Sequence, residues 1–304
     1  MGSNFGASEV HPIMVIKRLA LGTAQFGMAY GIANRSGQIS RSAAKTMLRL
    51  AKANGIDTLD TAIDYGESEA CLGEVGTSGF RVVTKLPKVP EDCADMRLWV
   101  HEQINASLAR LGVNVVYGLL LHRPEQLLEP AGEALYQALQ DLKESGRVQK
   151  VGISIYAPNE LDALIKRYRF DLVQAPFSLV DRRLHATGWL KRLKDEHIEV
   201  HTRSVFLQGL LLMSRKDIPQ KFSPWTELWN RWHEWLSLRN TSPLQTCLAF
   251  PLSYQEIDRV IVGADTATQL GQIIISSQEE MTPDFPDIHC DEGNLINPSR
   301  WSRL

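Results

Sequence analysis

The sequence has no marked excess of charge of either sign. Its 304 residues include 33 Lys and Arg against 35 Asp and Glu, a formal net charge of -2. This balance gives no overall field that would attract nucleic acid or an acidic membrane surface. No apolar run reaches the roughly 18 residues of a membrane span, and the N-terminus lacks a signal-peptide pattern. We therefore expect a cytoplasmic protein that binds neither nucleic acid nor membranes and whose partner is a small molecule. Nothing in the sequence indicates an oligomeric state.

Cysteine is scarce, and the chain lacks the paired spacing that zinc and redox sites use. We expect mostly packed, reduced thiols, with a disulfide as the alternative, at Cys71, Cys93, Cys247 and Cys290. His101 and His233 lack ligand spacing, so we expect no metal site. Gly22 and Gly27 do not form a dinucleotide-binding fingerprint, because the spacing is wrong and no helix is expected to begin there.

What the chain does contain is a regular alternation of strand and helix patterns. We expect strands at 19–23, 56–59, 80–86, 115–121, 148–154, 172–175, 198–205 and 259–262. Helices are expected at 40–55, 68–73, 95–111, 129–145, from 158 onward, 184–196, 244–252 and 267–275. Eight alternations favour a single α/β domain, a (β/α)8 TIM barrel, over an open doubly wound sheet.

Several local features refine this interpretation. Ser40 is expected to cap the first helix, and residues 23–40 to form a long loop. Leu98 is expected on the apolar side of helix 95–111, with Ile104 and Leu108. Residues 1–14 are interpreted as a flexible segment or a cloning remnant, and residues 282–304 as a tail near the barrel mouth. A helically spaced tryptophan stripe is typical of packing, with an aromatic substrate wall as the alternative, at Trp225, Trp229, Trp232 and Trp235.

Four side chains at successive strand ends form the candidate site. Asp60, Lys85 and His122 each lie at the end of an expected strand, and Tyr65 lies five residues after Asp60. In a barrel the loops after the strands converge on one face. A tyrosine beside a positive charge forms its phenolate more easily, so we expect Lys85, held by Asp60, to help Tyr65 deliver a proton. His122 would donate a hydrogen bond to a carbonyl oxygen nearby.

These residues carry a resemblance to the aldo-keto reductase family. Its three motifs are similar, in order, to Asp60-Thr61-Ala62-x-x-Tyr65-Gly66-x-x-Glu69, Val83-Thr84-Lys85 and Leu121-His122-Arg123-Pro124. Further matches are Leu21-Gly22-Thr23, Val151-Gly152-Ile153-Ser154, Val173-Gln174 and Arg203-Ser204-x-x-x-x-Gly209-Leu210-Leu211. The resemblance spans residues 17 to 275 and implies a barrel that reduces an aldehyde or ketone, sugar-like carbonyls included.

The resemblance also implies a nicotinamide cofactor, NADP(H) or NAD(H), with hydride from the cofactor and a proton from Tyr65. It implies cofactor contacts from residues at the same strand ends. These would be Gly22 and Thr23; Ser154 and Gln174 on the carboxamide; Arg203 at the nicotinamide; Ser204, Leu207 and Gly209 on the pyrophosphate; and Gly263, Asp265, Gln269 and Gln272 at the adenosine.

Three positions depart from the family pattern. Ile155 replaces an amide side chain after Ser154, and Arg203 replaces an aromatic residue. Asp265 follows Gly263 where many relatives carry Lys or Arg for a 2′-phosphate, which leaves NADPH and NADH both open. Arg215 or Lys216 would be candidates to compensate.

Other interpretations stay open for this sequence. Each candidate residue alone has an ordinary structural reading as a cap, a loop residue or a core residue, and Glu69 reads as an ion-pair partner. A nicotinamide-binding regulatory or auxiliary barrel with little turnover is the first alternative. A barrel lyase or isomerase without nicotinamide is a second.

Overall fold

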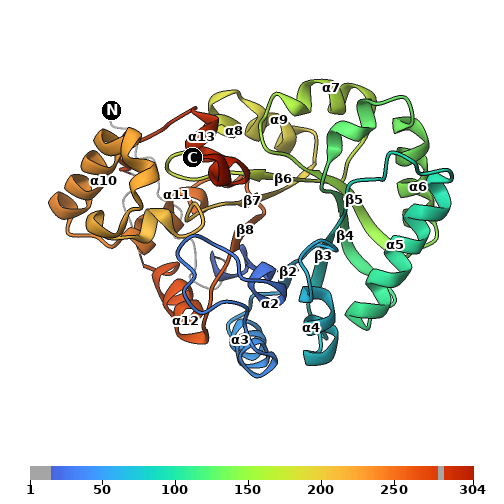
Figure 1. Ribbon diagram of the computed structural model, residues 1–304, viewed down its shortest axis with the longest axis horizontal. Helices are drawn as coiled ribbons and strands as arrows, with labels where there is room; N and C mark the ends of the chain where they lie inside the picture. The colour runs from blue at the N-terminus through green and yellow to red at the C-terminus, as the bar shows by residue number, and fades with distance from the viewer. Residues whose placement is uncertain (1–14, 280–283) are drawn as a thin grey trace, which may run out of the picture.

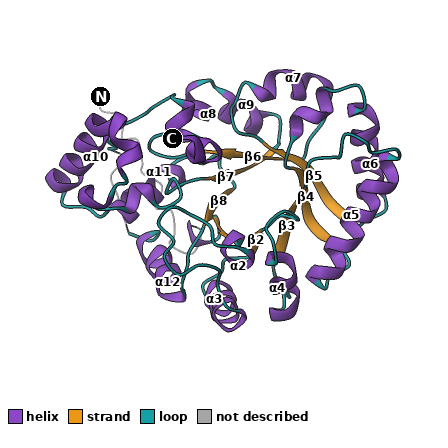
Figure 2. Ribbon diagram, viewed as in Figure 1, coloured by secondary structure: helices purple, strands orange, loops and turns teal. Residues whose placement is uncertain are grey.

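Eight parallel strands close into a barrel at the centre of the computed structural model (Figures 1 and 2). The structure describes residues 15–279 and 284–304. In chain order the strands are β1 (Leu19–Gly22), β2 (Thr58–Asp60), β3 (Arg81–Leu86), β4 (Val116–Leu121), β5 (Val148–Ser154), β6 (Leu172–Pro176), β7 (Glu199–Arg203) and β8 (Arg259–Val262). Each strand pairs with its neighbours in sequence, and β1 also pairs with β8. The (β/α)8 prediction is confirmed.

Helices cover the outside of this barrel (Figure 2). The connecting helices are α3 (Arg41–Ala53), α4 (Ser68–Val75), α5 (Met96–Leu111), α6 (Gly132–Glu144), α7 (Glu160–Arg167), α8 (Arg183–Ala186), α9 (Trp189–Asp195), α11 (Pro243–Leu252) and α12 (Ala267–Ser276). Additional helices are α2 (Ala24–Gly27), α10 (Thr226–Arg239) and α13 (Gly293–Ile296). Short 3-10 helices occupy Pro124–Leu128, Leu210–Leu212, Arg215–Asp217, Gln220–Trp225 and Pro298–Arg303. No helix among the described residues has the length and apolar character needed to cross a bilayer.

Side-chain caps start four of these helices, because the first backbone N–H groups of a helix have no partner within it. The expected cap of α3 is present: the Ser40 hydroxyl accepts from the Ala43 N–H at 3.3 Å. The same arrangement begins α5, α11 and α12, at Asp95, Ser242 and Thr266. Local sequence therefore determines where these helices begin.

The structure corrects three local expectations. Leu98 is 55% exposed, because it lies two positions before Val100 and therefore on the opposite side of α5 from the buried stripe. The helix expected at 184–196 is divided into α8 and α9 at Gly188, whose φ of 77° interrupts it. The loop expected at 23–40 contains α2.

The barrel interior is polar near both ends of its strands, with a small apolar layer of Val83, Leu120 and Leu172 between. Near the N-terminal ends, Glu199 accepts a hydrogen bond from the Tyr117 hydroxyl at 2.7 Å and forms an ion pair with Lys150. The other Glu199 oxygen lies 2.7 Å from His201 Nε2. We call Tyr117, Lys150, Glu199 and His201 the lower cluster. The main core lies outside the barrel, between strands and helices.

Residues 284–304 lie across the C-terminal ends of the strands, beside β6 and β7 (Figure 1). The Cys290 N–H donates to the Val180 carbonyl at 2.8 Å, and Lys221 Nζ donates to the Trp301 carbonyl at 2.8 Å. The Trp301 ring packs edge-on against Phe222 at 4.9 Å between centroids. Residues 1–14 and 282–283, for which we also made predictions, lie outside the described residues.

The tryptophan stripe packs inside the protein. Trp225, Trp229 and Trp232 are buried, and the Trp229 and Trp232 indoles donate to the Phe222 and Leu211 carbonyls. None of the four tryptophans lines the pocket described below. All four cysteines are free thiols.

Candidate functional site

A buried ion pair lies at the C-terminal ends of β2 and β3. Lys85 Nζ donates to both Asp60 carboxylate oxygens, at 2.9 and 2.8 Å, and to the Thr61 carbonyl at 2.8 Å. These three bonds use every donor of the ammonium group, and its side chain is 1% exposed. Burial lowers the pKa of Lys85, and the adjacent Asp60 carboxylate opposes that effect. The two groups therefore depend on one another, because removal of either leaves a buried charge unpaired.

Two polar side chains from β5 and β6 extend this pair into a network. Gln174 Nε2 donates to Asp60 Oδ1 at 2.6 Å, and the Ser154 hydroxyl donates to Gln174 Oε1 at 3.2 Å. Both residues are buried. Of the two side chains predicted to hold a carboxamide, Gln174 is thus bonded directly to the candidate catalytic carboxylate, and Ser154 is linked to it through Gln174.

Backbone contacts fix the turn that carries Tyr65. A Cβ added to Gly27 in α2 would lie 1.7 Å from the Tyr65 carbonyl oxygen, and one on Gly66 would lie 2.5 Å from the Gly27 carbonyl oxygen. Gly66 also has a φ of 53°, which favours glycine. This contact places the Tyr65 ring with its centroid 5.1 Å from Lys85 Nζ.

Tyr65 is held as a neutral phenol. Burial raises its pKa well above the usual value, Asp60 raises it further, and Arg203 opposes the increase. Asp60 holds the Lys85 ammonium behind the Tyr65 ring, and the predicted part of Lys85 in easing phenolate formation stays a prediction. A protonated phenol at this position is still a proton donor.

His122 follows β4 directly and lies beside Tyr65, with 5.9 Å between ring centroids and the rings nearly perpendicular. Burial and the positive charges of Lys85, Arg203 and Arg123 lower its pKa to about 3. Near neutral pH the imidazole is therefore uncharged and has one N–H to donate. The Asp64 carboxylate lies 3.9 Å from His122 Nδ1 and is 55% exposed.

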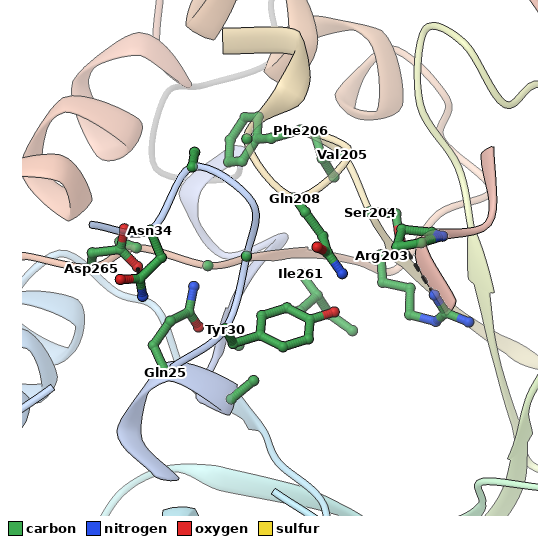
Figure 3. A pocket seen from close by; sticks show the side chains of 18 of the residues that line it. Gln25, Tyr30, Asn34, Arg203, Ser204, Val205, Phe206, Gln208, Ile261 and Asp265 are labelled. Carbon is green, nitrogen blue, oxygen red and sulfur yellow. Dashed lines mark hydrogen bonds between the residues drawn. The ribbon is translucent and has the colours of Figure 1, made fainter. Parts of the chain in front are cut away.

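A pocket of about 630 Å³ opens above these groups (Figure 3). Among the predicted residues it is lined by Gly22, Thr23, Asp60, Tyr65, His122, Ser154, Arg203, Ser204, Gly209, Gly263, Asp265, Gln269 and Gln272. Lys85 and Gln174 lie behind this lining, and Leu207 is buried at 1% exposure. Lining residues that our sequence prediction did not assign include Asn34, Tyr156 and Gln208.

The end of the pocket at Asp265 is built from loops. Asn34 Nδ2 donates to Asp265 Oδ1 at 3.2 Å, and the Asp265 N–H donates to Gln269 Oε1 at 2.7 Å. The loop after β1 also approaches the loop after β7, where the Ala33 N–H donates to the Gln208 carbonyl at 3.4 Å. Burial raises the pKa of Asp265. Figure 3 shows Asn34 and Asp265 together at one side of the pocket.

The other two departures lie together near β5 and β7. Ile155 is fully buried and does not line the pocket, and its carbonyl accepts from Arg203 Nη2 at 2.9 Å. The Arg203 guanidinium carbon lies 4.8 Å from the centroid of the Tyr156 ring. Arg203 is the only Lys or Arg among the described residues that line this pocket.

Outside the pocket, Glu69 forms the ion pair expected of it. Its carboxylate pairs with Arg110 at 2.7 Å and accepts from the Thr84 and Ser107 hydroxyls at 2.6 Å each. Within residues 15–279 and 284–304, no group of three or more His, Cys, Asp or Glu side chains is arranged to hold a metal ion.

Comparisons with known proteins agree with this geometry. The sequence model of the Aldo/keto reductase family matches residues 18–287. An uncharacterized oxidoreductase of Bacillus subtilis, YqkF, is 26% identical over 64% of this chain and 67% of its own length. A 6-dehydroglucose reductase of Novosphingobium aromaticivorans is 35% identical over 42% of this chain, which spans 46% of that relative. The holo form of aldo-keto reductase AKR11C1 from Bacillus halodurans has the same fold, with a TM-score of 0.69 at 20% identity over 88% of each chain.

Proposed function

Because the chain belongs to the aldo/keto reductase family, an oxidoreductase family of carbonyl reduction, we propose that it reduces an aldehyde or ketone with NADH or NADPH and a proton from Tyr65. The observation that carries the proposal is the buried Asp60–Lys85 pair below Tyr65 and beside His122, at the closed end of the pocket. Structural roles alone do not require a buried lysine there, because burying an ion pair is costly.

The pocket fits an extended dinucleotide. It runs from Tyr65 and Ser154 at one end to Asp265 and Gln269 at the other. Between them the loop after β7 holds Ser204, Leu207 and Gln208 at positive φ, a strained conformation that is found at ligand-binding turns. When bound, the cofactor supplies the hydride.

The protein's own groups position the carbonyl and manage the proton. The carbonyl oxygen lies between the Tyr65 hydroxyl and the His122 N–H, and the uncharged imidazole polarises it. As hydride reaches the carbon, the phenol gives its proton to the oxygen. The resulting phenolate is stabilised by Lys85 and Arg203, the two cations nearest to it, while Asp60 keeps Lys85 in place.

A Tyr65→Phe variant tests this assignment. We expect kcat to fall by about 10² to 10⁴, since one general acid contributes that much. The affinity for NADPH and NADH, followed by fluorescence titration, should change little, because the ring remains. A Tyr117→Phe variant, which removes the buried hydroxyl of the lower cluster, is the matched control. If Tyr65→Phe oxidised cofactor as fast as the parent across a panel of aldehydes and ketones, Tyr65 would not be the donor.

For the substrate, we propose a sugar-like aldehyde. The support is the 6-dehydroglucose reductase similarity, which covers less than half of either chain. A panel that compares aldehydo sugars with aliphatic aldehydes of equal length tests it, through kcat/KM. Equal values for the two sets would remove the sugar assignment.

One observation favours a second function, a nicotinamide-binding regulatory barrel with little turnover. The Gln174 amide is already bonded to Asp60 and Ser154, and Ile155 offers no polar side chain. The carboxamide of a nicotinamide would therefore compete with Asp60 and Ser154 for the Gln174 amide. Tight cofactor binding without turnover on any carbonyl of the panel would favour this function over catalysis.

A further inference from the structure

Two arginines lie around one aromatic ring at the edge of the site. The guanidinium carbons of Arg203 and Arg123 are 4.8 and 5.9 Å from the centroid of the Tyr156 ring. Neither arginine forms an ion pair with any of the described residues, whereas Arg41, Arg110 and Arg183 each do. Two positive charges therefore stand next to the pocket without a fixed counter-charge.

Arg203 is oriented rather than free. Its Nη2 donates to the Ile155 carbonyl at 2.9 Å, its Nη1 approaches the Ser204 hydroxyl at 3.3 Å, and its plane is supported by Tyr156. These contacts leave further N–H donors of the guanidinium unused. A stacked and hydrogen-bonded guanidinium has already lost most of its side-chain freedom, so binding an anion costs it little more.

Two acids interact with these charges without forming an ion pair: Arg123 opposes the rise in the pKa of Asp64 that burial causes, and Arg203 does the same for Glu160. Asp64 is half exposed and points toward His122 at 3.9 Å. Glu160 has one carboxylate oxygen occupied by the backbone N–H groups of Tyr156 and Ala157, at 2.9 and 2.6 Å. Lys85, the other cation of the site, is paired with Asp60. Neither Arg203, which lines the pocket, nor Arg123, which lies beside it across the Tyr156 ring, thus has an ion-pair partner among the described residues.

We propose that Arg203, assisted by Arg123, binds an anionic group on the carbonyl substrate, such as a carboxylate, and so selects acidic aldehydes or ketones. This inference rests on the proposed function, because it names the substrate class of the same site. Planar guanidinium groups match carboxylate and phosphate oxygens in two-point hydrogen bonds. Arg203 shares the pocket wall with Tyr65, His122 and Tyr156, whereas Figure 3 shows Asp265 on the other side. An anionic group on the substrate would therefore lie close to Arg203, whereas the adenosine end of the cofactor would lie on the Asp265 side of the pocket.

The test compares two aldehydes of similar shape, 4-carboxybenzaldehyde and 4-methylbenzaldehyde. In the parent enzyme we expect kcat/KM to favour the carboxylate by about tenfold or more, the usual strength of a charge-assisted bond. Arg203→Met should reduce that ratio by about tenfold, and Arg123→Met, at the exposed rim, by about threefold. Arg147→Met, an exposed arginine before β5 at the opposite end of the barrel, should leave the ratio unchanged.

A binding measurement keeps the proposal independent of turnover. The Tyr65→Phe variant saturated with NADP+ or NAD+ is titrated calorimetrically with both aldehydes, with and without Arg203→Met. We expect the carboxylate-bearing aldehyde to bind more tightly than the methyl-bearing one, and Arg203→Met to abolish this preference. Failure of the proposed function would appear separately, as a parent that reduces no carbonyl or a Tyr65→Phe variant that remains active.

Two results would overturn the proposal. The first is a carboxylate-to-methyl ratio that Arg203→Met and Arg123→Met leave unchanged, in either the kinetic or the binding measurement. The second is a loss of NADPH and NADH affinity in Arg203→Met without a change in that ratio. In the second case the anion that Arg203 binds would belong to the cofactor.

Discussion

The barrel contains two clusters of the same chemical groups, one near each end of its strands. Tyr65, Lys85, Asp60 and His122 lie at the C-terminal ends, and Tyr117, Lys150, Glu199 and His201 form the lower cluster. Both contain a tyrosine, a lysine, a carboxylate and a histidine. What differs is how the bonds are distributed among them.

In the lower cluster every partner converges on the carboxylate. Glu199 accepts from the Tyr117 hydroxyl, from Lys150 and from the His201 ring. Burial raises the pKa of Glu199, but these three partners together outweigh burial and lower it. The Tyr117 hydroxyl is therefore already hydrogen-bonded to an acceptor within the protein. In the cluster at the C-terminal ends Asp60 accepts from Lys85 and Gln174 instead, and Tyr65 lines the pocket. The two clusters thus differ in which group the carboxylate holds, and we expect reactivity to follow that difference.

Removing the lysine from each cluster tests the difference between the two clusters most directly. We expect Lys85→Met to lower kcat by about 10³, because the phenolate loses its nearest cation and Asp60 is left buried and unpaired. Lys150→Met should retain near-parental kcat and lose about 1 to 3 kcal/mol of unfolding free energy, since Glu199 keeps two other partners. Steady-state kinetics and urea unfolding at pH 7 measure the two effects. Equal losses of kcat in both variants would mean that the lower cluster also supports the chemistry.

The pH dependence of the unfolding free energy distinguishes His122 from an ordinary surface histidine. The folded pKa of His122 is about 3, below the 6.5 of an unperturbed histidine. The unfolded chain therefore binds the extra proton first, and stability is lost as pH falls from 6.5 toward 3. Between pH 6.5 and 4.5 we expect the parent to lose about 2 kcal/mol more than His122→Asn. Urea unfolding across this range measures the difference. Parallel curves for the two proteins would show that His122 is not held uncharged.

The smallest effect is expected at the Asp265 end of the pocket, where we predict the adenosine to bind. It tests a second difference, between the parts of the pocket built from strand ends and the parts built from loops. No Lys or Arg lines the described part of the pocket near Asp265, and this carboxylate would repel a 2′-phosphate. We expect Asp265→Arg to shift the NADPH-to-NADH affinity ratio by about tenfold toward NADPH, with little change in kcat. Asp265→Asn, which removes the charge and keeps the size, is the control and should shift the ratio less. Parallel fluorescence titrations with both cofactors measure it, and an unchanged ratio in both variants would refute the assignment of Asp265.

The same contrast explains what could be predicted from sequence. The strands and the candidate residues at their ends could be predicted from the sequence, because a parallel barrel brings every strand end to one face. Asp60 and Lys85 are 25 residues apart in sequence and still form a direct pair. The positions of β5 and β8 agree with prediction residue for residue.

The loop-built parts could not be predicted in this way. Asn34 and Asp265 are hydrogen-bonded although 231 residues separate them in sequence, and no periodic pattern relates their two loops. The bond from Gln174 to Asp60 was missed for a different reason. Family resemblance assigns Gln174 to the cofactor, whereas the distance between β2 and β6 across the barrel determines that it reaches the carboxylate. Tyr156 lies outside every motif that carries the resemblance, so no sequence signal marked it as part of the pocket.

The contact between Gly27 and Gly66 sets a limit for protein engineering. Because α2 and the tyrosine turn touch through backbone atoms, any side chain at either position would push Tyr65 out of register with Lys85. Libraries that aim to change the substrate should therefore keep both glycines and vary the pocket wall instead. Tyr156, Leu212 and Leu244 line the pocket and lie outside this contact, so we expect them to offer room for change without disturbing the proposed proton donor.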